Sequence, residues 1–337
     1  MMAVSVRDVA ALAGVSVGTV SNVLNRPDKV APGTVQRVQD AIERLGFVRN
    51  DSARQLRVGR STTIGLVVLD GGNPFFTDLA RGAEDAAAAA GLAVLVGNSD
   101  ESADRERVYI DLFEERRVAG VLISPVSDDL SRLARLRDNG TAVVLVDRQA
   151  DDSGFSSVSV DDVAGGRIAT QHLVDIGRRR IAFVGGPFTI RQVVDRLAGA
   201  RQATARHPEV SLEVLEVATL SVLEGRRAGE RILALPAGDR PDAVFAANDL
   251  VAVGIEQAFV MRGDIRIPEE IALVGYDDIA FAAATVVPLT SVRQPSVEIG
   301  STAVAMLIRE SEADATALAP EHVQFQPELV IRASTSG

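Results

Sequence analysis

The sequence contains no cysteine, and histidine and lysine are rare. The absence of cysteine excludes disulfides, thiolate catalysis and cysteine-ligated metal sites, and it gives no sign of secretion. The only lysine, Lys29, has no glycine-rich context, so the chain carries no phosphate-binding-loop lysine and no Schiff-base lysine in its larger part. Three histidines lie far apart without metal-ligand spacing, and we interpret them as structural or surface residues: His172, His207 and His322. We therefore expect neither a metal nor a cofactor.

Long hydrophobic runs are also lacking. The longest apolar stretch, residues 86–96, contains Gly91 and has about half the length that spans a bilayer. Arg7 and Asp8 stand where the apolar core of a signal peptide would lie. We therefore expect a cytoplasmic protein with no membrane partner.

Acidic residues outnumber basic ones overall, but the excess is not uniform along the chain. The length of 337 residues is enough for two or three domains. The formal net charge is −11, yet residues 1–60 hold nine basic and five acidic residues. A basic N-terminal segment followed by an acidic remainder is typical of a phosphate-binding module joined to a domain that does not contact nucleic acid. Chance could give the same asymmetry, but the motif within these residues favours the first interpretation.

Residues 4–25 have the pattern of two short helices joined by a tight turn. The turn lies at Gly14 and Val15, and the second helix opens at Ser16. Apolar residues at helical spacing can form one small core: Val9, Leu12, Val15, Val20, Val23 and Leu24. Short and partly polar residues between them would face outward: Val17, Gly18, Ser21 and Asn22. This layout predicts a helix-turn-helix whose second helix enters a DNA major groove.

A third helix is predicted over residues 32–46, with proline in its first turn and glycine at its end. Ser16 can cap the second helix by accepting the N–H of Thr19. Thr19 and Ser21 can donate to phosphates, and Asn22 can pair with a base edge, preferably adenine. The alternative for Asn22 is a side chain that merely faces solvent.

Residues 50–60 are polar and arginine-rich, with a helix-like core at residues 52–56. A helix of this length is unstable alone in water. One interpretation is an ordinary linker. The other is a segment that folds only on DNA, with Leu56 wedged between base steps of the minor groove and Arg54 or Arg57 nearby.

From Thr63 the sequence alternates between apolar runs and amphipathic segments. Near-continuous apolar strands separated by helices predict parallel sheets that are covered on both faces. The expected strands are residues 64–69, 92–97, 120–124, 142–147, 157–161, 180–185, 212–218, 243–248, 271–277 and 291–294. The expected helices are residues 75–90, 103–116, 162–176, 196–205, 222–235, 250–261 and 297–308. So many strands exceed one comfortable sheet, and we expect two doubly wound α/β subdomains.

Ligands of open parallel sheets bind beyond the carboxyl ends of the strands. In this sequence polar or charged residues follow the apolar runs: Asp70, Asn73, Ser124, Asp147, Arg148, Asn248, Asp249, Asp277 and Gln294. A cleft between two subdomains would gather these residues around one polar ligand.

Two patterns that could indicate catalysis have better explanations. Residues 14–18 match the G-x-S-x-G nucleophile motif, but that motif follows a strand and here a helix precedes it. The adjacent carboxylates at 161–162 and 277–278 would point apart, so neither pair is an acid–base couple. Asp277 suits ligand binding, and residue 161 or 162 suits helix capping. No catalytic residue is predicted, and we do not expect an enzyme.

Several segments, in this order and spacing, match one protein family. They are VRDVAALAGVSVGTVSNVLN (6–25), ARQLR (53–57), NPFF (73–76), VDR (146–148), VDDVAGGRIATQHL (160–173), RLAGARQA (196–203), AND (247–249), VGYDDI (274–279) and PLTSVRQP (288–295). Over essentially its whole length the chain resembles the lac repressor/galactose repressor (LacI/GalR) family of bacterial transcription regulators.

The resemblance implies a helix-turn-helix domain, a hinge and an effector-binding domain. These would occupy residues 1–49, 50–61 and 62–337. The effector-binding domain would be periplasmic-binding-protein-like, with one subdomain at about 62–161 plus 291–320 and the other at about 162–290 plus 321–337. The resemblance also implies a homodimer, or a dimer of dimers, on a pseudo-palindromic operator, with hinge helices that insert Leu56 in the minor groove.

The resemblance further implies two sets of site residues. The DNA-binding set is Val6, Ser16, Val17, Gly18, Thr19, Ser21, Asn22, Asn25, Ala53, Leu56 and Arg57. The effector set is Phe75 or Phe76 for stacking, with Asp147, Arg196, Asn248, Asp249, Asp277 and Gln294, to which we add the strand-end residues Asn73, Ser124 and Arg148. The effector of this family is usually a sugar and less often a nucleobase, and carboxylates, an arginine and flat apolar faces suit vicinal hydroxyls.

The sequence departs from the family at two places. Gly18 stands where many members have a base-contacting side chain, and Val17 offers only an apolar contact, for example to a thymine methyl group. Residues 188–195, FTIRQVVD, match poorly just before Arg196, which leaves the identity of the effector open.

We predict a sequence-specific DNA-binding regulator, a repressor of a carbohydrate uptake or catabolism operon, whose two subdomains respond to a bound sugar. A nucleobase-responsive or corepressor-dependent regulator is the alternative within the family. A sugar-binding transport receptor and a carbohydrate-active enzyme using Asp147, Asp249 or Asp277 are rivals from other classes.

Overall fold

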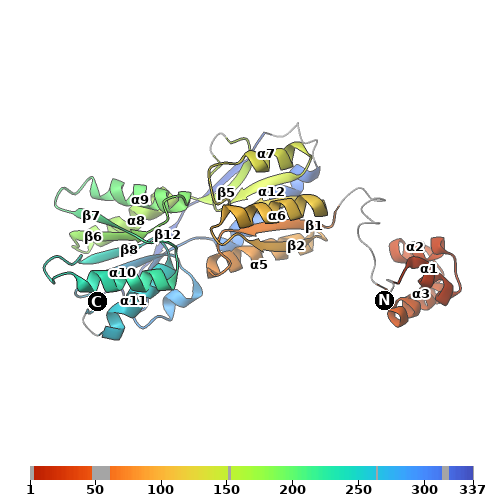
Figure 1. Ribbon diagram of the computed structural model, residues 1–337, viewed down its shortest axis with the longest axis horizontal. Helices are drawn as coiled ribbons and strands as arrows, with labels where there is room; N and C mark the ends of the chain where they lie inside the picture. The colour runs from red at the N-terminus through yellow and green to blue at the C-terminus, as the bar shows by residue number, and fades with distance from the viewer. Residues whose placement is uncertain (1–3, 48–60, 151–152, 263–264, 313–318, 337) are drawn as a thin grey trace. The chain divides into compact units, whose positions relative to one another are not determined.

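The computed structural model describes residues 4–47, 61–150, 153–262, 265–312 and 319–336 (Figure 1). The chain separates into two compact units, residues 1–60 and residues 61–337, here called the head and the body. Three predicted DNA-binding residues, Ala53, Leu56 and Arg57, lie outside the described residues. No helix in the described part of the chain is long and apolar enough to cross a membrane.

The described residues of the head form short helices with well-defined ends. These are α1 (Val6–Ala13), α2 (Val17–Asn25), the 3-10 turn η1 (Pro27–Lys29) and α3 (Pro32–Leu45). Ser16 caps α2 by accepting the N–H of Thr19 at 3.1 Å, which confirms the prediction. Gly14 and Gly46 end α1 and α3 with φ angles of 66° and 60°, a left-handed conformation that glycine adopts without strain.

The core of the head differs from the prediction at one residue. Val9, Val20 and Val38 are completely buried, and Val15 packs against them, as the pattern indicates. Leu12 was predicted in this core, but 43% of its surface is exposed. The prediction was wrong because α1 packs through positions 6, 9, 10 and 13, which share one helix face that position 12 does not join.

The first sheet of the body has the strand order β11-β5-β4-β3-β1-β2, with parallel pairing throughout. Its strands are β1 (Thr63–Val68), β2 (Ala93–Asn98), β3 (Gly120–Ile123), β4 (Ala142–Val146), β5 (Ser156–Val160) and β11 (His322–Phe325). One face packs on α5 (Pro74–Ala89) and α12 (Ser296–Glu312), and the other on α6 (Ala103–Arg116) and α7 (Ser131–Asp138). Both faces are therefore covered, which explains the near-continuous apolar strands.

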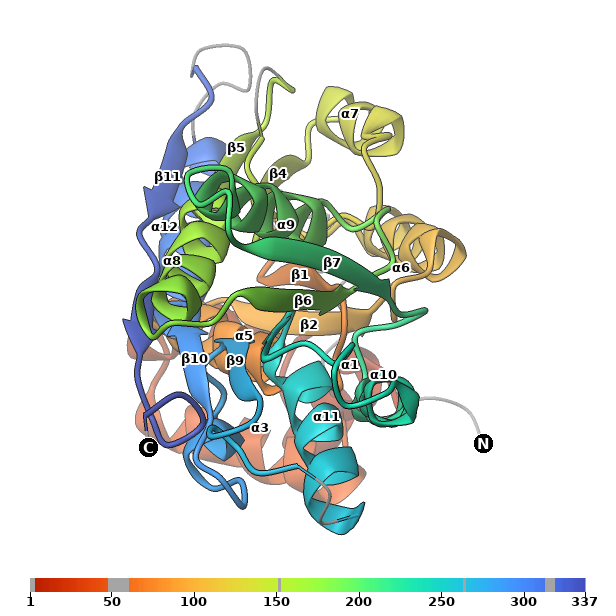
Figure 2. The same ribbon diagram turned by 90° about the vertical axis from the view of Figure 1, so that its left-hand side faces the viewer.

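The second sheet has the order β12-β10-β9-β8-β6-β7, and only β12 runs antiparallel to its neighbour among the described strands. Its strands are β6 (Arg180–Gly185), β7 (Ser211–Glu216), β8 (Ala243–Ala246), β9 (Ala272–Asp277), β10 (Thr290–Arg293) and β12 (Glu328–Val330). Helices α8 (Asp162–Asp175) and α9 (Arg191–Thr204) cover one face, and α10 (Val222–Ala234) and α11 (Asp249–Arg262) cover the other (Figure 2). The two doubly wound subdomains are those predicted.

The chain passes between the two sheets after β5, after β10 and after β11. The predicted subdomain boundaries are therefore wrong at two places. Residues 291–293 belong to the second sheet, because β10 pairs with β9. Residues 322–325 belong to the first sheet, because β11 pairs with β5.

One short helix and two short strands were not predicted, and two helices, α9 and α12, are longer than expected. Helix α7 and strands β11 and β12 were not predicted because they are short. The two strands are also only half-buried, so they lack a continuous apolar run. Helix α9 begins at residue 191 instead of 196. The additional turn matters, because it carries Gln192 into the interior.

Helices α8 and α9 approach each other closely through two glycines. A Cβ atom at Gly166 of α8 would lie 1.9 Å from the carbonyl oxygen of Arg196, and one at Gly199 of α9 would lie 2.0 Å from the carbonyl oxygen of Val163. Both obstacles are backbone atoms, so neither could move aside alone. The backbone of Arg196 is therefore held at a fixed distance from α8.

We expect Gly166→Ala to destabilise the body by about 1–3 kcal/mol, because the methyl group must push two packed helices apart. Urea unfolding followed by circular dichroism measures the effect. Gly238→Ala is the matched control, since a Cβ atom there has nothing within 4 Å. Equal free energies of unfolding for the two variants would show that the close approach is not needed.

Candidate functional site

Helix α2 presents the candidate DNA-reading surface of the head. Val20 and Val23 are buried in the core, whereas Val17 is 43% exposed and Gly18 and Asn22 are also exposed. Positions 18 and 22 are one helical turn apart and share a face. The outward face therefore offers an apolar group and an amide at a place where base edges could be contacted.

Other predicted DNA-binding residues have partners inside the head. Ser16 Oγ and Thr19 Oγ1 lie 2.9 Å apart. Asn25 Nδ2 donates to the carbonyl oxygen of Ser21 at 2.7 Å and to its Oγ at 3.2 Å. A hydroxyl can still accept or donate a further bond, so these contacts orient the side chains without blocking them. Val6 is half-buried against the head core, and its contact with DNA stays a prediction.

A small cavity of about 30 Å³ lies between the two subdomains of the body. Seven of the predicted effector residues line it: Asn73, Phe75, Phe76, Asp147, Arg196, Asn248 and Asp277. Four residues that were not predicted complete the lining: Leu69, Ile190, Gln192 and Leu220. This volume is about a tenth of the lower end of the range of about 300–1,000 Å³ for ligand pockets, so a ligand the size of a sugar fits only when the subdomains move apart.

Asp277, at the end of β9, receives hydrogen bonds from both subdomains. Asn73 Nδ2, from the first subdomain, donates to Asp277 Oδ2 at 2.7 Å, and Gln294 Nε2 donates to Oδ1 at 2.8 Å. Arg196 Nη1 lies 3.9 Å from Oδ1. Burial raises the pKa of Asp277 to about 6, and Arg196 and the two amides limit the rise. Its φ angle of 104° is unusual for a residue other than glycine, and such strain gathers at functional sites.

Asp147, at the end of β4, occupies the corresponding position in the first subdomain. Its φ angle is 55°, so both strand-end carboxylates are held in unusual backbone conformations. Gln192 Nε2, from the second subdomain, donates to Asp147 Oδ2 at 2.9 Å and to its carbonyl oxygen at 2.5 Å. Oδ1 has no hydrogen-bond partner among the described residues. Burial and the charge of Asp162 raise the pKa of Asp147 well above its ordinary value.

Arg196 connects the buried acidic groups. Its Nε donates to Asp162 Oδ1 at 2.8 Å, and its Nη1 donates to the carbonyl oxygen of Ala247 at 2.7 Å. The guanidinium carbon lies 3.7 Å from the centre of the Tyr276 ring, which is a cation–π contact. Burial lowers the pKa of Arg196, but Asp162, Tyr276 and Asp277 outweigh it and raise the pKa overall. The guanidinium therefore stays charged and tightly held.

Apolar groups provide the remaining contacts of the cavity. The rings of Phe75 and Phe76, in the first turn of α5, are 5.0 Å apart at 75° to each other. The Asn73 side chain caps this helix by accepting the N–H of Phe75 at 3.0 Å. Asn248 similarly accepts the N–H of Val251 and donates to the carbonyl oxygen of Leu220. Both asparagines are therefore fixed by backbone contacts.

Four predicted effector residues do not line the cavity. Gln294 reaches it only through its bond to Asp277. Arg148 donates to the carbonyl oxygen of Ser127 and pairs with Asp128. Asp249 accepts the Ser291 hydroxyl and the N–H of Ile279, so it fixes the loop after β9. Ser124 is completely buried away from the lining.

A second group of acids lies in the first subdomain and contacts the backbone of the second subdomain beside the cavity. Glu101 lies near Asp70 and Asp100, and its carboxylate is close to the backbone N–H of Leu220 in the second subdomain. Burial, together with Asp70, raises the pKa of Glu101 to about 7, and the bond to Leu220 opposes this rise. The sequence gives no sign of the contact, because residues 101 and 220 each follow an edge strand of a different sheet.

We expect the free energy of unfolding of the body to fall as the pH rises from 5 to 8. The pKa values of Glu101 and Asp277 are raised to about 7 and about 6, so the folded state binds their protons more tightly than the unfolded chain. The stability from this binding is full below their ordinary pKa values of 4.5 and 3.8, and it is lost as the pH passes through 6 and 7.

Glu101→Gln should raise the Tm at pH 8 by about 2–4 °C, which corresponds to about 1 kcal/mol, and should change it little at pH 5. Differential scanning calorimetry at the two pH values measures this difference. Glu84→Gln, at an exposed position of α5, is the control. If the Tm of Glu101→Gln changes with pH as much as the Tm of the unchanged protein, Glu101 is not the source of the pH dependence.

The arrangement is suited to binding a polar neutral molecule. Two carboxylates offer acceptors, Arg196 and two asparagines offer donors, and two aromatic rings offer an apolar face. Among the described residues no group of three histidine or acidic side chains could hold a metal ion.

Comparison with known proteins agrees with this description. Residues 5–50 match the family of bacterial regulatory proteins described as the lacI family, and residues 170–335 match a periplasmic binding protein-like domain. The ribose operon repressor of Bacillus subtilis is 34% identical over 305 residues, which cover 90% of each chain.

Solved structures are similar over the whole length. The complex of the transcriptional regulator CelR with cellobiose is 31% identical, covers 98% of this chain and 99% of its own, and has a TM-score of 0.72. The lac repressor dimer bound to operator and the anti-inducer ONPF is 26% identical, covers 100% of both chains, and has a TM-score of 0.84. With its helix-turn-helix head, its two-subdomain body and a relative of this identity and coverage, the chain belongs to the lacI family of bacterial regulatory proteins.

Proposed function

We propose that the protein is a cytoplasmic, sequence-specific transcriptional repressor whose affinity for operator DNA is controlled by a neutral sugar. The observation that carries the proposal is the cavity between the subdomains, where strand-end carboxylates from both sheets meet one buried arginine. The head of a lacI-family protein supplies the DNA-binding function.

The charges around the cavity favour a neutral sugar over an anionic ligand. Asp147, Asp162 and Asp277 are buried around Arg196, whose guanidinium is already paired with carboxylates. A phosphate would have to displace these partners and would be repelled by the remaining acids. Sugar hydroxyls can donate to the carboxylates and leave the charge unchanged. The names of a ribose operon repressor and a cellobiose complex among the similar proteins support this class of ligand.

The DNA side of the proposal rests on α2 and on the hinge. Asn22 would contact a base edge and Val17 a thymine methyl group, whereas Gly18 adds no side chain. Leu56 would insert in the minor groove, as the resemblance to the family implies. With few base contacts in α2, operator preference would depend strongly on the hinge and on half-site spacing.

The regulation is a shift between conformations. Direct bonds join the subdomains at Asn73–Asp277 and at Gln192–Asp147, so a ligand in the cavity changes the balance between closed and open arrangements. If DNA and sugar favour different arrangements, each weakens the binding of the other; if they favour the same one, each strengthens it.

The test is fluorescence anisotropy with a labelled DNA fragment from upstream of the protein's own gene and a scrambled fragment. We expect a preference for the first fragment, and weaker binding at 200 mM than at 50 mM salt. One neutral sugar among ribose, glucose and cellobiose should change the Kd by about 5–150-fold, whereas ribose 5-phosphate should not.

Asp277→Asn should keep operator affinity and lose the response to the sugar, because it removes the acceptor charge at the centre of the cavity. The same substitution at Asp85, an exposed position of α5, is the control. Absence of any sequence preference would refute the operator proposal. A response only to hypoxanthine would favour the nucleobase alternative, and consumption of the sugar would favour an enzyme.

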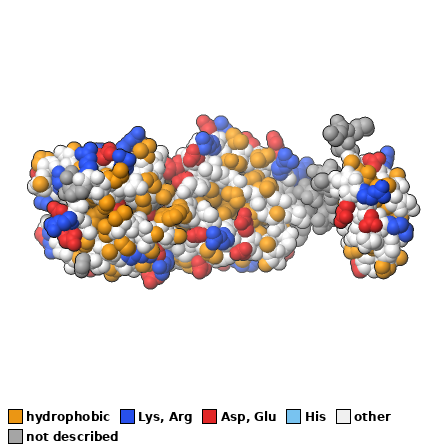
Figure 3. All heavy atoms as spheres, turned by 90° about the horizontal axis from the view of Figure 1, so that it is seen from below, with side chains coloured by type: hydrophobic (Ala, Val, Ile, Leu, Met, Phe, Trp, Pro, Cys, Tyr) orange, Lys and Arg blue, Asp and Glu red, His pale blue; other side chains and the backbone are white. Residues whose placement is uncertain are grey.

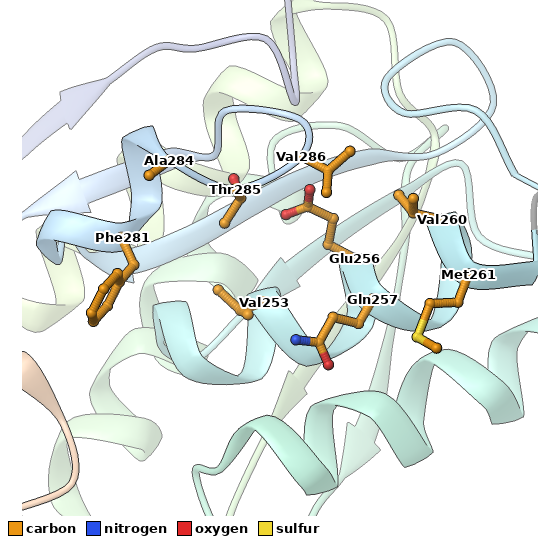
Figure 4. Close-up of a pocket in the computed structure, with 9 residues that line it drawn as sticks. All are labelled: Val253, Glu256, Gln257, Val260, Met261, Phe281, Ala284, Thr285 and Val286. Atoms are coloured by element: carbon orange, nitrogen blue, oxygen red, sulfur yellow. The ribbon is translucent and has the colours of Figure 1, made fainter.

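A homodimer forms part of the proposal, supported by an apolar groove on the second subdomain (Figure 4). The groove lies between α11 and the segment around η2 (Ala280–Ala283), and its lining is mostly apolar: Val253, Glu256, Gln257, Val260, Met261, Phe281, Ala284, Thr285 and Val286. Met261, Phe281 and Val286 are 70%, 61% and 78% exposed. Figure 3 shows apolar side chains gathered over the left-hand part of the body, where the second sheet lies.

The first subdomain has its own exposed apolar side chains. Leu95 and Val96 of edge strand β2 are 45% and 48% exposed, and Val108 of α6 is 62% exposed. Apolar surface on both subdomains suits an interface with a second copy, as does the dimer in the lac repressor structure. A contact through both subdomains would also transmit their relative movement to the partner.

Phe281→Glu combined with Met261→Glu should convert the dimer to a monomer, because charges would be buried against apolar surface. Operator affinity should then fall by more than tenfold, since one half-site contact is lost. Light scattering after gel filtration measures the mass. Ile331→Glu, at a position 55% exposed outside the groove, is the control. A double variant that remains dimeric would refute this interface.

A further inference from the structure

A buried acid lies in the apolar groove of the second subdomain. Glu256 extends from the middle of α11, is 3% exposed, and points toward the segment that carries Thr285 and Val286 (Figure 4). The other residues of the lining are uncharged and mostly apolar. Burying a carboxylate without a partner costs far more free energy than burying an apolar group. The charge of Glu256 therefore opposes complete burial of a surface that otherwise suits apolar contact.

Only one carboxylate oxygen of Glu256 is satisfied. Oε1 accepts the N–H of Val287 at 2.6 Å. Oε2 is also buried, and it has no hydrogen-bond partner among the described residues. Burial raises the pKa of Glu256, and the hydrogen bond from Val287 opposes this rise. The ionised form is therefore disfavoured even before anything covers the groove.

The neighbouring elements do not supply a charge that compensates Glu256. The segment 279–289, which carries η2, contains no charged residue. On α10, Arg226 pairs with Glu230 at 3.2 Å, and at the start of α11 Asp249 accepts the hydroxyl of Ser291. Arg262 follows six residues later on α11 and lies on another face of that helix. At the end of β9, Asp277 is held by two side-chain amides.

We propose that formation of the homodimer takes up one proton at Glu256 of each protomer. This inference rests on the proposed function, since it concerns the interface proposed there. The two faces of a symmetric interface are the same surface, so the covering groove residues bring neither lysine nor arginine. A second copy then removes the remaining water from Oε2 without offering a cation. The neutral acid is buried there at much lower cost than the carboxylate.

The sign of the effect follows from this uptake. Covering the groove raises the pKa of Glu256 further, so the dimer binds protons more tightly than the separate protomers. The dimer has its full affinity below the pKa of Glu256 in the free protomer, and it loses affinity as the pH rises above that value. Two linked protons can raise the Kd for dissociation of the dimer by up to about 100-fold per pH unit.

The test is sedimentation velocity of the full chain over a series of concentrations at pH 5.5, 7.0 and 8.5. We expect the Kd for dissociation of the dimer to rise by at least about tenfold between the lowest and the highest pH. Glu256→Gln keeps the size of the side chain and an acceptor for Val287 but cannot ionise. Its Kd should therefore change by less than about threefold over this range. Glu256→Met is a second variant that cannot ionise, and it should behave in the same way.

Glu213→Gln, at an exposed position of edge strand β7 outside the groove, is the matched control and should follow the unchanged protein. Equal pH dependence in the unchanged protein and in both Glu256 variants would overturn the inference and leave the proposed dimer intact. A Kd that falls as the pH rises would also overturn it, because the partner would then donate to the ionised carboxylate. If the unchanged protein is monomeric at every pH, the proposed dimer fails and this inference fails with it.

Discussion

The pairing of one buried guanidinium with carboxylates is the interaction on which the rest of the body depends. Arg196 is held by Asp162, by the carbonyl oxygen of Ala247 and by the ring of Tyr276, and it lies 3.9 Å from Asp277. A buried charge that loses its partner is strongly destabilising, so the stability of the body depends on these contacts. The glycine contact between α8 and α9 fixes the backbone of the same arginine. Helix packing and ligand chemistry are therefore linked through one side chain.

The parts of the site that the sequence predicted are those that depend on topology. Parallel strands end at the same edge of a sheet, so polar residues after apolar runs, such as Asp147 and Asp277, were expected to meet. Sequence position does not tell where a side chain points, and Arg148 and Asp249 follow the same rule but bind neighbouring loops. Gln192 was not predicted because helix α9 begins at Arg191, one turn before the start that the sequence indicated. In the head, Leu12 was wrongly predicted in the core because its side chain points away from the face of α1 that packs.

Head and body make opposite uses of charge. The first sixty residues carry an excess of arginine, which suits a polyanion, whereas buried acids surround the one arginine of the cavity. A ligand that resembled the backbone of DNA would therefore be a poor ligand of the body. This difference keeps the two binding functions of one chain chemically separate, so that they communicate through conformation.

The three passages of the chain between the sheets all lie at one edge of the body. Strands β5 and β11 form one edge of the first sheet, and β10 and β12 form the corresponding edge of the second. The N–H of Asp161 donates to the carbonyl oxygen of Phe325, which ties two of the passages together. Residues 101 and 220 follow β2 and β7, the opposite edges. The tied edge can serve as the axis of a rotation, and the Glu101 contact, at the far edge, would then separate when the cleft opens.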